Sequence, residues 1–113
     1  MKKILIIGWV FTAIASVVLL YSVYGKLFNG GMIEYMFEVG VGKYVTLIAF
    51  GELVATSLFL IPATSRFGLL LLSAHMGGAI VIHLSNEEPF AFQSGILILI
   101  WLGGIFRNWE RFR

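Results

Sequence analysis

The sequence predicts an all-α integral membrane protein, a four-helix bundle in one domain covering residues 1–113, with a short interfacial amphipathic helix between its first two spans. Two observations predict it. Hydrophobic residues make up 59% of the chain and charged residues only 12%, about half the charged share of a soluble globular domain. Long apolar segments also alternate with short polar turns, as expected of helices that cross a bilayer.

The first predicted span covers residues 4–24, which contain no charged side chain. Its length is sufficient to cross about 30 Å of hydrocarbon. A secretory signal peptide is the alternative, because Lys2 and Lys3 precede the apolar core and Ala13-Ile14-Ala15 resembles a cleavage site. A membrane helix is favoured because the apolar sequence continues through Tyr24.

The connector, residues 25–43, contains two predicted helix breaks, at Gly30-Gly31 and at Gly40 and Gly42. Between them, residues 32–39 place apolar side chains on one helical face and two glutamates on the other. Such a segment suits the membrane interface, where we expect it to cap the bundle. A ligand gate is the less favoured interpretation.

The remaining spans are predicted at about 44–62, 66–84 and 90–106. The short turn at residues 62–65 forces the second and third spans to lie side by side and antiparallel. Residues 85–89 form a second polar turn, and a basic, aromatic tail follows the fourth span.

The distribution of basic residues predicts the orientation, because cytoplasmic loops are enriched in lysine and arginine. One side of the predicted bundle carries Lys2, Lys3, Arg66, Arg107, Arg111 and Arg113, and the other carries Lys26 and Lys43. We therefore expect a multi-pass protein of the cytoplasmic membrane with both termini in the cytoplasm.

Composition also excludes several classes of function. The chain has no cysteine, which removes dithiol chemistry, thiolate nucleophiles and cysteine-ligated metals. It has no basic stripe interleaved with exposed aromatics, so nucleic-acid binding is not expected. We predict no metal site and no catalytic residue.

Glu52 and His75 are the main candidate site residues, because an ionisable side chain inside a membrane helix marks a functional site by default. At 1.5 Å of rise per residue, antiparallel helices place both roughly 12–14 Å below the same surface. We expect them to touch each other or share one ligand. The alternative, a buried polar pair that only fixes helix register, stays open.

Two further groups of residues belong to this prediction. His83 and Lys26 are expected to line an entrance near the outer headgroups, above Glu52 and His75. Small residues around His75, namely Gly68, Gly78 and Ala79, should let a neighbouring helix approach closely, and Gly77 on another face should support a homo-oligomer. Haem is disfavoured, because His75 and His83 lie at different depths on one helix.

Several segments resemble the DoxX-like family of small four-helix membrane proteins: YGKLFNG, FGELVATSLFLIPATSRFGLLLL, HMGGAIVIHL, EPF and ILIWLGGIFR. The resemblance covers most of the chain from Tyr24 to Arg107. It implies an integral membrane protein whose relatives include the small subunit of a thiosulfate–quinone oxidoreductase and proteins linked to quinone, catechol or oxidative stress. The positions carried over are Gly25, Lys26, Glu52, His75, Gly77, Gly78 and His83.

We therefore expect a binding or accessory protein for a quinone-like or other lipophilic small molecule, either a homo-oligomer or an accessory to a membrane oxidoreductase, and not a stand-alone enzyme. A proton-coupled transporter or channel is one alternative. It needs an inner exit, for which the second and third spans offer only Ser57 and Ser73. The other alternative is a structural or assembly subunit without a ligand.

Overall fold

The computed structural model describes the backbone of residues 2–112 and the side chains up to Glu110. Within that range the chain forms helices and connecting turns, without a β-strand. The elements are α1 (Lys2–Phe28), α2 (Gly30–Glu38), the 3₁₀ helix η1 (Gly42–Tyr44), α3 (Val45–Leu60), the 3₁₀ helix η2 (Pro62–Thr64), α4 (Ser65–Ser85), α5 (Ala91–Arg107) and α6 (Trp109–Phe112). The predicted all-α class is confirmed.

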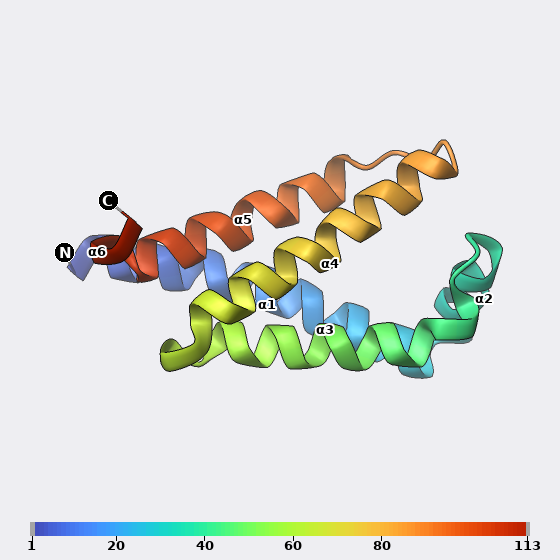
Figure 1. The fold of residues 1–113 in the computed structure, drawn as a ribbon, viewed down its shortest axis with the longest axis horizontal. Helices are drawn as coiled ribbons and strands as arrows, with labels where there is room; N and C mark the ends of the chain where they lie inside the picture. Colours follow the sequence, from blue (N-terminus) through green and yellow to red (C-terminus); the bar gives the residue numbers. More distant parts are fainter. Residues whose placement is uncertain (1, 113) are drawn as a thin grey trace.

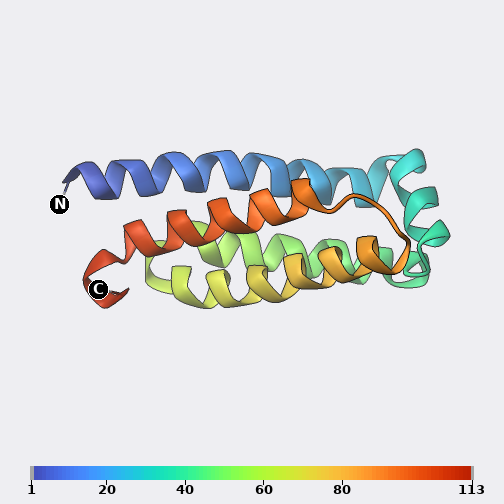
Figure 2. The same ribbon diagram turned by 90° about the horizontal axis from the view of Figure 1, so that it is seen from above.

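The four long helices lie side by side in an elongated molecule measuring 46 × 25 × 18 Å (Figures 1 and 2). Helix α1 packs against α3 and α5, and α4 packs against the same two helices. Both termini lie at one end, called here the termini end, and α2 lies across the other, called the α2 end (Figure 1). Consequently α1 and α4 run towards the α2 end, and α3 and α5 run away from it.

Three segments among the described residues are long and apolar enough to cross a membrane: Lys2–Phe28, Gly42–Leu60 and Pro62–Ser85. The fourth, α5, is a shorter apolar helix of 17 residues. Large apolar side chains on all of them point outward, including Val17 at 69% exposure and Leu47 at 70%. The interior core is made by Ala15, Leu19, Ala55, Phe59, Leu69, Leu72, Met76, Ile96 and Ile100.

The first predicted helix break is wrong in position. Helix α1 continues to Phe28, and Gly30 and Gly31 form the first turn of α2. The break falls at Asn29, whose side-chain oxygen accepts a hydrogen bond from the backbone amide of Met32 at 3.0 Å. Asparagine favours this N-cap position because its side chain satisfies an amide that the helix leaves unpaired. The second break is at Gly40, whose φ of +93° suits glycine.

The glycines of α4 differ in their packing. Gly68 lies directly against the backbone of Phe59 on α3, so a Cβ there would overlap it, and the predicted close approach is confirmed. Gly77 and Gly78 are different, because a Cβ at either would meet nothing within 4 Å. The expected close approach of a helix at Gly78 and Ala79 is therefore wrong, since both face a pocket. Contact between copies at Gly77 stays a prediction.

Candidate functional site

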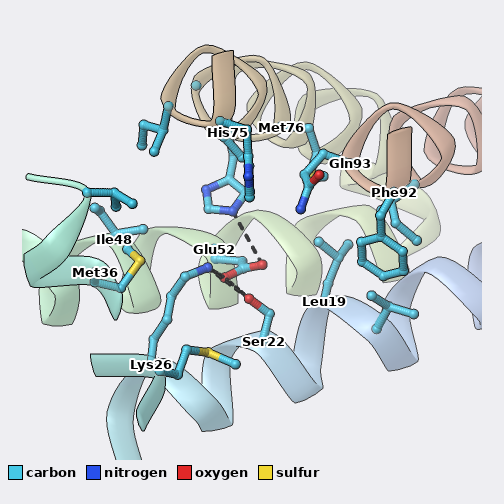
Figure 3. Close-up of a pocket in the computed structure, with 18 of the residues that line it drawn as sticks. Leu19, Ser22, Lys26, Met36, Ile48, Glu52, His75, Met76, Phe92 and Gln93 are labelled. Carbon is cyan, nitrogen blue, oxygen red and sulfur yellow. Dashed lines mark hydrogen bonds and ion pairs between the residues drawn. The ribbon is translucent and has the colours of Figure 1, made fainter. Parts of the chain in front are cut away.

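A cavity of about 580 Å³ occupies the half of the molecule nearest the α2 end. Helices α1, α2, α3, α4 and α5 all contribute to its wall, so it exists only in the assembled fold (Figure 3). Most of the lining is apolar, with methionines from α2 and α4 and leucine, isoleucine and phenylalanine side chains from the other helices. The size and the apolar lining are typical of a small-molecule site.

The carboxylate of Glu52 forms the floor of this pocket and is 2% exposed. Its Oε1 lies 2.7 Å from the Lys26 ammonium and accepts a second hydrogen bond from the Ser22 hydroxyl at 3.2 Å. The ammonium also donates to the Ser22 oxygen at 2.8 Å. Ser22 and Lys26 are four residues apart on α1, so they share the helical face that looks at α3.

His75 completes this network from α4. Its Nε2 lies 3.3 Å from Oε2 of Glu52, on the opposite side of the carboxylate from Lys26 (Figure 3). The predicted contact between Glu52 and His75 is confirmed. It forms because α3 and α4 are antiparallel neighbours joined by the short η2 turn. The floor network, here Ser22, Lys26, Glu52 and His75, is thus held by α1, α3 and α4.

Lys26 lies deeper in the bundle than its sequence position suggested. It was predicted beside His83 at an entrance, but its ammonium reaches the carboxylate of Glu52 and the residue is only 9% exposed. The long aliphatic stem of lysine allows this, since it can pack along apolar surface while the charge finds a distant partner. A buried carboxylate without a cation would be costly, and Lys26 supplies that charge.

His83 belongs to a separate polar cluster at the rim of the pocket. Its Nδ1 lies 3.1 Å from Oε1 of Glu88, and the same oxygen accepts a hydrogen bond from the Tyr35 hydroxyl at 2.5 Å. Burial, followed by the hydrogen bond and the charge of Glu88, raises the pKa of Tyr35 from 10.0 to about 12. This rim cluster joins α2 to the end of α4. It is separate from the floor network, whereas His83 and Lys26 were expected to lie together at one entrance.

Gln93 of α5 was not singled out from the sequence. It lines the same pocket, and Figure 3 shows its side-chain amide nitrogen pointing towards the space above Glu52. Its Oε1 is buried without a hydrogen-bond partner among the described residues. A polar residue near the start of an otherwise apolar helix could have drawn attention to it. Ser22 was likewise missed, although it lies one turn before Lys26.

Among the described residues, the half of the molecule nearest the termini end offers no continuous polar path. Ser57 and Ser73 donate hydrogen bonds to carbonyls of their own helices, Leu53 and Leu69, at 2.8 and 2.7 Å. The buried hydroxyls of Ser16 and Thr56 have no hydrogen-bond partner within the described part of the chain. A hydrogen-bonded chain from Glu52 to the termini end is therefore interrupted in this structure.

At the termini end, Arg107 of α5 contacts α1 and the last residue of α3. Its guanidinium lies 3.9 Å from the centre of the Trp9 ring and donates hydrogen bonds to the Thr12 hydroxyl and the Leu60 carbonyl, both at 3.3 Å.

Between residues 2 and 112, no group of three or more histidine, aspartate or glutamate side chains is placed to hold a metal ion.

Comparison with known proteins gives no assignment: no protein-family model, curated protein or solved structure matches this chain.

Proposed function

We propose that this chain is an integral membrane four-helix bundle that binds a quinone-like or other lipophilic small molecule in the pocket above Glu52. It acts as a binding or accessory subunit linked to redox or stress metabolism. The observation that carries the proposal is the pairing of an apolar cavity of about 580 Å³ with the floor network of Ser22, Lys26, Glu52 and His75.

The apolar exterior supports the membrane location. Side chains such as Val17, Leu47 and Leu70 are more than 60% exposed, whereas the polar network lies inside. This distribution is the reverse of a soluble protein and suits lipid. The basic residues of the termini end then favour a cytoplasmic position for both termini.

The rim of the pocket supports a lipophilic ligand. Tyr21 of α1 and Phe92 of α5 line the cavity and are also 66% and 64% exposed on the outer surface. Helix α5 begins at Ala91 and is much shorter than α1, so α1 extends beyond the start of α5 towards the α2 end (Figure 2). A molecule dissolved in the bilayer can enter sideways there, with its apolar tail remaining in lipid.

The alternatives receive less support. A proton-coupled transporter needs a path to the termini end, and the hydroxyls of Ser16 and Thr56 leave that path interrupted. A purely structural role accounts for the ion pair of Lys26 and Glu52, but it gives no reason for a large cavity beside it, because unfilled space destabilises a fold. The resemblance to the DoxX-like family favours redox metabolism and an oxidoreductase or homo-oligomeric partner.

The first prediction tests the pocket with a decyl-substituted benzoquinone titrated calorimetrically into protein in nanodiscs. We expect saturable binding that Gly78→Leu reduces at least about tenfold, because the new side chain fills open space in the cavity. Glu52→Gln should also weaken binding, since it disturbs the floor network that orients polar groups of the ligand.

Gly51→Leu is the matched control. A Cβ at Gly51 also meets nothing within 4 Å, but this glycine does not line the pocket. It should bind the quinone as the unmodified protein does. Binding that is absent in the unmodified protein, or equal in all three variants, would overturn the proposed function.

A further inference from the structure

We infer that Gln93 is a ligand-binding residue whose side-chain amide donates a hydrogen bond to a carbonyl oxygen of the bound molecule. This inference rests on the proposed function and adds the chemical group that the site recognises.

Among the buried and half-buried polar side chains that line the pocket, Gln93 is the one with neither a hydrogen bond nor an ion pair within the described residues. Glu52 uses both carboxylate oxygens, with Lys26 and Ser22 on one and His75 on the other. At the rim, Tyr35 and His83 share Glu88. Within the described residues the carboxamide of Gln93 has no hydrogen-bond partner, although its Oε1 is buried. The amide nitrogen of Gln93 is therefore free to donate a hydrogen bond to a molecule in the pocket.

The orientation of the amide determines what that partner must offer. The nitrogen points into the pocket towards the space above Glu52, whereas the oxygen points away towards Met76 (Figure 3). An amide nitrogen can only donate, so the partner must present an acceptor. A carbonyl oxygen fits this requirement.

The charge of the floor favours an uncharged ligand. The ammonium of Lys26 balances the carboxylate of Glu52 at 2.7 Å, so the network as a whole requires no further ion. A charged molecule would have to lose its hydration without a compensating partner. The site therefore fits a neutral ring that carries carbonyl groups, with Gln93 at one carbonyl and His75 and Lys26 across the pocket.

The experiment compares decyl-benzoquinone with its hydroquinone, kept reduced under anaerobic conditions, on the unmodified protein and on Gln93→Glu at pH 8. An ionised carboxylate accepts from a hydroxyl but repels a carbonyl oxygen. We therefore expect Gln93→Glu to shift the quinone-to-hydroquinone affinity ratio at least about tenfold towards the hydroquinone. The ratio should return as acid protonates the new carboxyl and restores a donor.

Gln93→Met provides a second variant of nearly the same shape. It should lower quinone affinity about tenfold and leave decylbenzene, which has no oxygen, unaffected. Ser94→Ala, next to Gln93 but outside the lining, is the control and should bind as the unmodified protein.

The outcomes separate this inference from the proposed function. Saturable quinone binding that Gly78→Leu blocks, with an affinity ratio unchanged in Gln93→Glu, would leave the proposed function standing and overturn the role of Gln93. Failure of the unmodified protein to bind any of the three molecules would overturn both.

Discussion

At the scale of single residues, two buried threonines in this interior differ in their hydrogen bonds. Thr12 donates to the Gly8 carbonyl at 2.8 Å and accepts from Arg107 at 3.3 Å. The hydroxyl of Thr56 has no partner among the described residues, and the side chain is 0% exposed. A buried hydroxyl stabilises a fold only when it is bonded, because it has given up its hydrogen bonds to water.

We therefore predict opposite effects for the same chemical change at these positions. Thr56→Val should leave stability unchanged or raise it by about 1 kcal/mol, since it removes an unsatisfied group and keeps the shape. Thr12→Val should lower stability by about 1–2 kcal/mol, because Arg107 loses an acceptor. Unfolding in mixed micelles measures both. Equal destabilisation by the two variants would indicate that the hydroxyl of Thr56 is bonded in the folded protein, for example to an internal water.

At the scale of elements, helix α2 covers one end of the pocket and makes few contacts with the rest of the bundle. Met36 is its one buried residue, and the link to the far side of the pocket runs through the Tyr35 hydroxyl and Glu88. Tyr35→Phe should increase hydrogen exchange of the α2 amides about fivefold, the effect of losing about 1 kcal/mol. Tyr44→Phe is the control, since Tyr44 is exposed and outside the pocket. Equal protection in both variants would contradict the role of Tyr35.

The pKa of Tyr35 gives this link a defined pH range. A phenol whose pKa is raised in the folded state stabilises that state below its ordinary pKa of 10.0, and the stabilisation is lost as the pH rises through about 12. In an absorbance titration of tyrosinate, the difference between the unmodified protein and Tyr35→Phe should therefore have its midpoint near pH 12. Glu88→Gln should move that midpoint towards 10. A midpoint already near 10 in the unmodified protein would contradict the buried hydrogen bond.

At the scale of the whole molecule, the features set by hydrophobic periodicity and helix geometry could be predicted from the sequence. These are the four long helices, the antiparallel α3–α4 pair and the contact of Glu52 with His75, which follows from equal depth on neighbouring helices. Features that depend on side-chain conformation were missed. The depth of Lys26 depends on how its flexible stem folds, and the role of Gln93 depends on where α5 begins relative to α1.

The pocket could not be predicted from sequence patterns either, because small residues can indicate either close packing or open space. Gly68 and Gly78 both lie on the face of α4 expected to point inward, yet one contacts α3 and the other borders the cavity. The difference arises from the angle between α3 and α4, which lie against each other near η2 and separate towards the α2 end (Figure 1). The angle between two helices is not encoded in the local spacing of residues.

The arrangement of the whole chain leads to a last prediction, about topology. The α2 end should face outward and the termini end the cytoplasm, because Lys2, Lys3, Arg66 and Arg107 belong to the termini end, whereas only Lys26 and Lys43 of the described residues belong to the α2 end. The chain has no cysteine, so single cysteines can be introduced without a background. Asn29→Cys and Ser85→Cys should react with a membrane-impermeant maleimide in intact cells, whereas Ala63→Cys should react only after permeabilisation. All three positions are exposed, so accessibility within the protein does not limit labelling. Labelling of Ala63→Cys in intact cells, with protection at the other two, would reverse the orientation, and equal labelling of all three would reject a transmembrane arrangement.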